Sequence, residues 1–163
     1  MVGVREMAED PRFETQSDDS QKFLMFQLGA ELFATPLIEV REVIEFNQAK
    51  PIPHMPSFFK GVINIRGEII GVIDLRERLG MTGSNENPCQ LIFETDAGPL
   101  AAVVDRVHSV AIVEESQLDR RTTITSQASD RSYFLGVGKV DDRIFTLISL
   151  RKLMKTDQAS VTT

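Results

Sequence analysis

The second half of this 163-residue sequence repeats the pattern of the first half. One set of matches has a constant offset of 67 positions, and another set has an offset of 75. Coincidence between apolar segments is the weaker explanation, because glycines and a Leu-Arg pair also match in register. Such a pattern predicts two copies of one supersecondary unit. The clearest matches are Leu24 with Leu91, Phe26 with Phe93, Gly61 with Gly136, and Leu75-Arg76 with Leu150-Arg151.

The most distinctive stretch of the sequence is KGVINIRGEIIGVIDLRERLG, residues 60–80. Two runs rich in β-branched residues flank Arg66-Gly67-Glu68, which predicts a β-hairpin. Both runs are apolar almost throughout, so we expect the hairpin to be covered on both faces. A short helix follows, with Asp74 as its N-cap and Gly80 just past its end.

Asn64 and Arg66 are polar residues inside this apolar hairpin. A buried amide or guanidinium needs hydrogen-bond partners. Either the two side chains bond to their own turn, or they face a docking protein. The residues alone do not decide between these two interpretations.

The rest of the chain reads as short strands joined by turns. Three prolines between residues 47 and 59 predict an extended connector. Each repeat holds about five strands and no long helix, which favours small barrels over βαβ units. We expect the two halves to pack on each other, because ~70 residues make a marginal core. The other expected elements are strands at 23–28, 32–35, 90–95, 99–104, 107–113, 135–140 and 143–150, a helical turn followed by a strand at 37–45, a helical turn at 114–118, and a helix at 150–155.

Composition divides the chain into a tail and a folded part. The formal net charge is −6, and residues 1–20 carry six acidic against two basic side chains. We therefore expect a disordered acidic tail at 1–20, a folded domain at 21–155 and a frayed end at 156–163. The nearly balanced folded part lacks the basic surface that a nucleic-acid-binding protein needs.

The sequence also favours a cytoplasmic protein. Cys89 is the only cysteine, so no intrachain disulfide can form. The first residues do not resemble a secretory signal, and no apolar run reaches the ~18 residues of a membrane helix. We expect no direct membrane insertion.

No arrangement of reactive residues predicts an enzyme. His54 lies among prolines, His108 lies in a strand-like segment, and neither comes with a metal-ligand pattern. No phosphate-binding loop or nucleophile elbow is present. We expect no catalytic residue, metal or cofactor. Two other classes stay open as weaker hypotheses, namely a hydrolase using Cys89 with His108 and a small-barrel nucleic-acid binder.

The segments FLMFQLG, ELFATPLIEVREVIE and PIPHMPSFFKGVINIRGEIIGVIDLRERLG resemble the CheW family of chemotaxis coupling proteins. The resemblance covers roughly residues 22–154. It implies an all-β fold of two five-stranded SH3-like barrels packed side by side, with a few short helices. It also implies a non-catalytic adaptor that bridges the cytoplasmic tips of chemoreceptors and the regulatory domain of the chemotaxis histidine kinase, at membrane-associated receptor arrays.

The same resemblance implies where the receptor binds. Family members contact the receptor helix through the groove between the barrels, whereas the kinase contact is barrel to barrel and is not assigned to single residues here. The matching receptor-binding positions are Val40, Glu42, Gly61, Asn64, Arg66 and Gly67.

Two residues depart from the family pattern. Pro36 and Gly71 stand where other residues are more frequent, and Gly71 occupies a position where proline is common. These departures bear on local strand geometry. The pattern is equally compatible with an adaptor of another receptor–kinase pathway, such as pilus motility or surface sensing.

Overall fold

The structure is a computed structural model, and it describes residues 20–83, 87–120 and 132–161. The predicted tail at 1–20 lies outside the described residues except for Ser20, which begins the first strand. The elements follow the expected order: β1 (Ser20–Leu28), β2 (Glu31–Pro36), η1 (Leu37–Glu39), β3 (Val40–Glu45), β4 (Phe59–Ile65), β5 (Glu68–Asp74), α3 (Leu75–Arg78), β6 (Cys89–Thr95), β7 (Gly98–Val104), β8 (Arg106–Glu114), η2 (Glu115–Gln117), β9 (Leu118–Asp119), β10 (Phe134–Val140), β11 (Arg143–Ile148) and α4 (Leu150–Val161).

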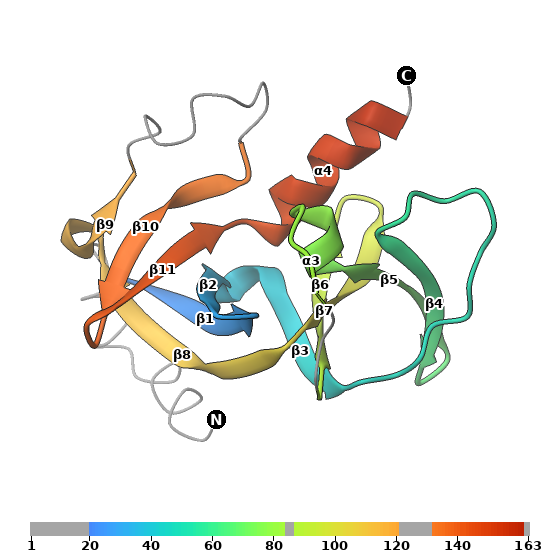
Figure 1. The fold of residues 1–163 in the computed structure, drawn as a ribbon, viewed down its shortest axis with the longest axis horizontal. Coiled ribbons are helices and arrows are strands. Elements are labelled where there is room, and N and C mark those ends of the chain that lie inside the picture. The colour runs from blue at the N-terminus through green and yellow to red at the C-terminus, as the bar shows by residue number, and fades with distance from the viewer. Residues whose placement is uncertain (1–19, 84–86, 121–131, 162–163) are drawn as a thin grey trace.

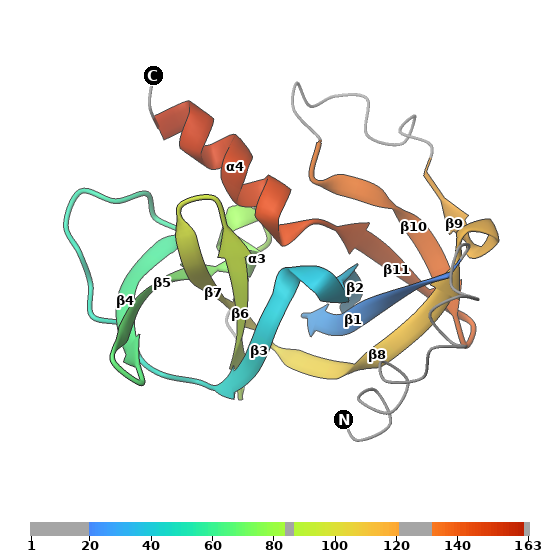
Figure 2. The same cartoon turned by 180° about the vertical axis from the view of Figure 1, so that it is seen from behind.

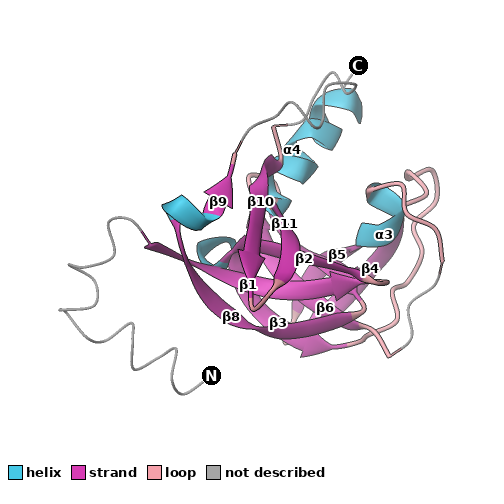
Figure 3. Cartoon of the chain, turned by 60° about the vertical axis from the view of Figure 1, so that its left-hand side comes forward, coloured by secondary structure: helices cyan, strands magenta, loops and turns pink. Residues whose placement is uncertain are grey.

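The strands form two sheets that curl into two barrels lying side by side (Figure 1). In the first barrel the strand order is β8-β1-β2-β11-β10-β9, and in the second barrel it is β3-β6-β7-β5-β4. Strands make up most of the body, with α3 and α4 beside them (Figure 3). The prediction of an all-β fold with two packed barrels is confirmed.

The barrels do not coincide with the sequence repeats. The first barrel takes its β1–β2 hairpin from the first repeat and β8 to β11 from the second. The second barrel takes β3 to β5 from the first repeat and its β6–β7 hairpin from the second. The chain crosses between barrels at η1, and it crosses back between β7 and β8. The sequence repeat would be the same whether each hairpin stayed in one barrel with the rest of its own repeat or joined the other barrel. The sequence therefore cannot distinguish these two arrangements.

The two barrels close in equivalent ways. Lys50 forms an isolated bridge with Val62 in β4, and β9 pairs with Val137 in β10. A β-bulge at Gly61 and another at Gly136 accompany these closures, with φ of +133° and +146°. A Cβ atom on Gly61 would lie 2.0 Å from the Lys50 carbonyl oxygen. The glycine thus lets the closing segment approach the hairpin. The sequence did not predict the two-residue strand β9. With β9, the described part of the first barrel has six strands, one more than the resemblance implies.

The largest apolar cluster lies between the barrels. It joins side chains of β1, β2 and α4 to side chains of β5, β6, β7 and α3, and we call it the inter-barrel core. Each barrel also has a smaller core of its own. The barrels are therefore parts of one folded unit, as the small size of each repeat predicts. Fully buried members of the inter-barrel core include Phe26, Leu28, Ile73, Leu75, Leu91, Phe93 and Leu150.

The prediction that the β4–β5 hairpin is covered on both faces holds for only part of its length. Ile70, Val72 and Ile73 are buried, whereas Asn64 is exposed and Ile69 is 61% exposed. β4 is the last strand of its sheet, so within this sheet only β5 of the hairpin pairs with a further strand, β7. The turn end of the hairpin projects beyond β7. The pairing of β5 with β7 begins only at Gly71.

Several local predictions can be compared with the structure. The carboxylate of Asp74 accepts a hydrogen bond from the amide of Glu77 and caps α3, and Gly80 follows that helix with a φ of +76°. Helix α4 continues to Val161, beyond the expected end at Lys155, so the segment expected to be frayed begins inside a helix.

The two departures from the family pattern both fit their surroundings. Pro36 ends β2 immediately before η1, where it needs no further strand pairing. A Cβ atom on Gly71 would lie 2.8 Å from Leu100 and 3.0 Å from the ring of Phe59. The space that a larger residue would need at position 71 is filled by these two side chains.

Candidate functional site

The candidate site lies where β3 passes the turn between β4 and β5. Figure 2 shows β3 at the boundary between the two barrels, and η1 directly precedes this strand. Val40, Glu42 and Ile44 of β3 are half-buried, whereas Arg41 and Val43 are exposed. A β-bulge at Arg41 shifts the register, so Val40 lies opposite Phe93, while Glu42 and Ile44 lie opposite Ile92 and Gln90 and face the other way. Val40 packs against the inter-barrel core.

The β4–β5 turn is held in one conformation. Its two central residues, Arg66 and Gly67, have φ of +51° and +87°, as a two-residue type I′ turn requires. The side-chain oxygen of Asn64 accepts a hydrogen bond of 2.9 Å from the amide of Gly67. Asn64 therefore braces its own turn, which is one of the two interpretations that the sequence left open.

Arg66 does not bond to its own turn. Its guanidinium donates to the carboxylate of Glu42 on β3, so the turn is joined to the opposite edge strand of the same barrel. The Arg66 side chain nevertheless stays mostly exposed, more so than that of Glu42. An exposed ion pair of this kind contributes little to stability, about 0–1 kcal/mol. Its charges are accessible to a partner.

A second set of charges lies beside this pair and was missed by sequence reasoning. The Arg41 guanidinium is 2.9 Å from the carboxylate of Glu68 and also 2.9 Å from that of Glu94. Hydrogen bonding to Glu68 raises the pKa of Arg41, against a smaller opposing effect of burial. The sequence does contain a signal for these ion pairs, because Arg41-Glu42 and Arg66-Gly67-Glu68 each carry one arginine and one glutamate. This signal can be interpreted only when β3 is known to face the β4–β5 turn.

The sequence-predicted receptor residues fall into two groups. Val40, Glu42, Asn64, Arg66 and Gly67 are gathered around the turn and the facing strand. Gly61 lies near the other end of β4, and its environment gives it the closing role described above.

The equivalent turn of the first barrel provides a contrast. Asp141 and Asp142 occupy the positions of Arg66 and Gly67, and they also have positive φ, of +50° and +64°. The two hairpins thus share their turn geometry, but the charge at the position of Arg66 is reversed. Only the second barrel presents an arginine here.

The surroundings of Cys89 and His108, the reactive residues considered from the sequence, do not favour nucleophilic chemistry. Burial raises the pKa of the Cys89 thiol, which disfavours the nucleophilic thiolate. His108 is exposed, and its Nε2 lies 2.8 Å from Gln27 Oε1. Among residues 20–83, 87–120 and 132–161, no three His, Cys, Asp or Glu side chains are grouped as metal ligands. None of the helices in these segments is long and apolar enough to cross a membrane.

Comparison with known proteins places these features in a family context. Residues 22–158 match the family model described as the CheW-like domain. The chemotaxis protein CheW of Klebsiella aerogenes is 29% identical over 143 residues, which cover 86% of each chain. CheW of Thermotoga maritima is 29% identical over 145 residues, covering 87% of this chain and 94% of its own.

The chain is also similar to one solved structure and to one relative that carries a different name. The crystal structure of the scaffolding protein TtCheW from Thermoanaerobacter tengcongensis superposes with a TM-score of 0.73 at 31% identity, covering 82% of this chain and 91% of that chain. Protein FrzA of Myxococcus xanthus is 32% identical over 98 residues, covering 60% of this chain and 61% of its own.

Proposed function

The chain belongs to the CheW-like domain family, and from this premise we propose that it couples chemoreceptors to the chemotaxis histidine kinase by binding both. It is a chemotaxis adaptor and not an enzyme, in keeping with its family. The proposed partners are the cytoplasmic tip of a methyl-accepting receptor and the regulatory domain of the kinase. The proposed location is the cytoplasm, at membrane-associated receptor arrays.

The observation that supports receptor binding is the pairing of Arg66 with Glu42 beside half-buried Val40. A receptor tip that presents a helix needs an apolar contact for affinity and fixed charges for register and selectivity. The turn supplies a guanidinium in a defined position, because Asn64 fixes the conformation of the turn. Arginine keeps its charge in a partly dry interface and offers several donors in a rigid fork.

The test of this function separates receptor binding from folding. In the Arg66→Ala variant we expect weaker binding to the receptor tip, while the melting temperature and the affinity for the kinase regulatory domain stay unchanged. Arg120→Ala is a matched control for receptor affinity, because Arg120 also pairs with an exposed carboxylate, Glu115, but on the first barrel.

A charge reversal makes the test sharper. The double variant Glu42→Arg with Arg66→Glu restores an ion pair at the same place but exchanges the charges presented to a partner. We expect a near-normal melting temperature and no recovery of receptor binding. Recovery of receptor binding by the exchange would show that the pair only braces the barrel. Equal loss of both partners, with a lowered melting temperature, would contradict the receptor assignment.

The alternative of an adaptor in another receptor–kinase pathway is less well supported. The relatives named as chemotaxis protein CheW cover 86% and 87% of this chain, which favours the chemotaxis pathway. A pull-down with receptor tips and kinase regulatory domains from the same cell would identify the pathway directly.

A further inference from the structure

The turn η1 presents one apolar side chain almost completely to solvent. Ile38 is 94% exposed, more than any other large apolar residue in the described part of the chain. Its neighbours in η1 point elsewhere, since Leu37 packs against the inter-barrel core and Glu39 is half-buried. Single exposed apolar residues are common and by themselves need no explanation. The surroundings of Ile38 are what distinguish it.

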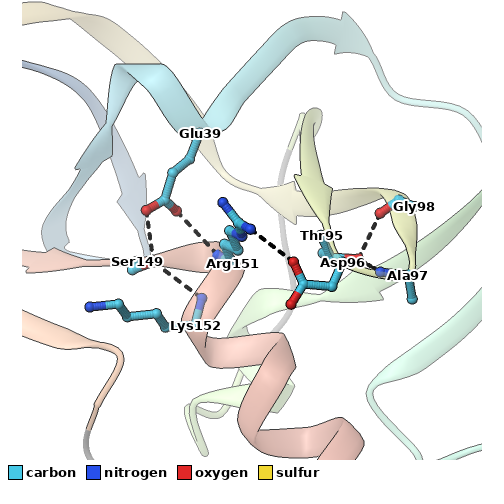
Figure 4. A network of polar contacts seen from close by, with 8 residues as sticks. All are labelled: Glu39, Thr95, Asp96, Ala97, Gly98, Ser149, Arg151 and Lys152. Carbon is cyan, nitrogen blue, oxygen red and sulfur yellow. Dashed lines mark hydrogen bonds and ion pairs between the residues drawn. The ribbon is translucent and has the colours of Figure 1, made fainter.

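Glu39 ties this exposed turn to a distant part of the chain. One carboxylate oxygen accepts a hydrogen bond of 2.8 Å from the hydroxyl of Ser149, and the other accepts one of 3.2 Å from the amide of Arg151 (Figure 4). Ser149 is buried, and its hydroxyl also accepts a hydrogen bond from the amide of Lys152 in the first turn of α4. The three-residue turn is thus fixed to the start of α4.

The same network extends into the second barrel. The Arg151 guanidinium donates a hydrogen bond of 2.8 Å to Asp96, which lies in the turn between β6 and β7 (Figure 4). Thr95 braces that turn through bonds to Gly98 and Ala97. Glu39 is therefore held by a helix that is itself anchored to the neighbouring barrel, so the position of Ile38 relative to both barrels is defined.

Ile38 lies directly before the candidate receptor site along the chain. It precedes Val40 by two residues, and Val40 begins the strand that carries Glu42. From η1 towards the β4–β5 turn, the chain therefore passes from exposed Ile38, through Val40 at the inter-barrel core, to the Glu42–Arg66 pair. This order of apolar and charged groups suits one helix that is apolar at one end of its contact and charged at the other.

We propose that Ile38 is an apolar anchor for the helical receptor tip, and that Glu39 is a positioning residue that holds Ile38 in place. This inference rests on the proposed receptor-binding function. It adds two residues to the surface, both outside the set expected from the family. An anchor fixed before binding loses less conformational freedom on association, which is why the tether matters for affinity.

The test compares two exposed isoleucines. Ile38→Ser should lower the affinity for the receptor tip by about ten- to a hundredfold, the effect expected when one buried aliphatic side chain is removed from an interface. The melting temperature and the affinity for the kinase regulatory domain should not change. Ile144→Ser is the matched control, because Ile144 is 69% exposed on the first barrel, and it should bind the receptor tip normally.

A second pair of variants tests the role of Glu39. Glu39→Gln keeps the size of the side chain but weakens its acceptor oxygens, and it should reduce receptor affinity by less than Ile38→Ser does. If Glu39 acts through Ile38, the double variant Ile38→Ser with Glu39→Gln should bind no more weakly than Ile38→Ser alone. An additive loss would contradict the positioning role.

The outcomes also separate this inference from the function on which it rests. Normal receptor binding by Ile38→Ser, when the wild-type protein binds, would overturn the inference alone. Failure of the wild-type protein to bind any receptor tip of its own cell would overturn both.

Discussion

Arg76 and Arg151 occupy equivalent positions in the two repeats, and each guanidinium links one barrel to a hairpin turn of the other. Arg76 of α3 lies 2.6 Å from the carboxylate of Asp105, which also accepts a hydrogen bond from Gly29 in the β1–β2 turn. Arg151 of α4 lies 2.8 Å from Asp96 in the β6–β7 turn. The exchange of hairpins between the repeats places both arginines at the boundary of the barrels.

The two links differ in burial, which leads to a first prediction. Arg76 and Asp105 have side chains only 11% and 15% exposed, whereas Arg151 and Asp96 are exposed. Removing one member of a buried pair leaves the other charge uncompensated, at a cost of about 3–5 kcal/mol. We expect Asp105→Asn to lower the free energy of unfolding by roughly 3 kcal/mol, the lower end of that range, because the pair is not fully enclosed.

Urea denaturation measures this effect, and Asp96→Asn is its control. The control variant should unfold at nearly the wild-type urea concentration. Similar losses in the two variants would show that burial does not distinguish the two links.

A second prediction concerns the closure of the second barrel. We expect Gly61→Ala to be much more destabilising than Gly98→Ala, although both glycines have positive φ, of +133° and +116°. The positive φ alone costs about 1–3 kcal/mol for an alanine. Only at Gly61 would the added Cβ also meet a backbone oxygen, whereas the space around Gly98 is open. Equal melting temperatures of the two variants would contradict the closing role of Gly61.

A third prediction uses the graded burial of the β4–β5 hairpin. Ile73→Ala should cost about 2–5 kcal/mol, because Ile73 is buried in the inter-barrel core. Ile65 is only half-buried, so the loss in Ile65→Ala should be smaller. Ile69→Ala should change stability by no more than about 0.5 kcal/mol. A loss below about 1 kcal/mol in Ile73→Ala would contradict its placement in the core.

Part of this fold could be predicted from the sequence, and part of it could not. Local signals were sufficient for the hairpins, for the Asp74 cap and for the single helical turn before β3, because each depends on neighbouring residues. The repeat also revealed the equivalence of Gly61 with Gly136. The exchange of hairpins between the barrels could not be predicted from the sequence. It depends on which of the two repeats supplies the strand that lies next to a hairpin in space.

The candidate site illustrates the same limit. The resemblance to CheW proteins gave Glu42 and Arg66 as separate residues, but their mutual pairing depends on how β3 meets the turn of the opposite edge strand. Arg41, Glu68 and Ile38 were missed because an exposed charge or isoleucine has no distinguishing pattern in the sequence. The burial of the hairpin was overestimated for a related reason, since an apolar run does not show where its neighbouring strand ends.

A fourth prediction concerns the pH dependence of His108. The folded protein removes part of the hydration of the largely exposed His108 ring, which lowers its pKa, and the nearby positive charges of Arg143 and Arg106 lower it further. In the unfolded chain the imidazole regains an ordinary pKa of about 6.5. As the pH falls through that value, the unfolded state binds the proton first, so the contribution of His108 to stability declines. This contribution is fully present above the unfolded pKa and is lost once the pH is below the folded pKa.

An NMR titration of the His108 ring tests the cause of this shift. Arg143→Gln should raise the pKa of His108 towards its ordinary value, because one of the repelling charges is removed. An unchanged pKa in this variant would show that Arg143 does not contribute to the shift.

The proposed adaptor function requires one molecule of this protein to bind receptor and kinase at the same time. The most direct measurement is a calorimetric titration of the kinase regulatory domain into the protein, first alone and then saturated with the receptor tip. Sedimentation then gives the composition of the complex. We predict similar kinase affinity in both titrations and a complex that contains all three components. Displacement of the receptor tip by the kinase domain, or kinase binding only in its absence, would contradict the adaptor function.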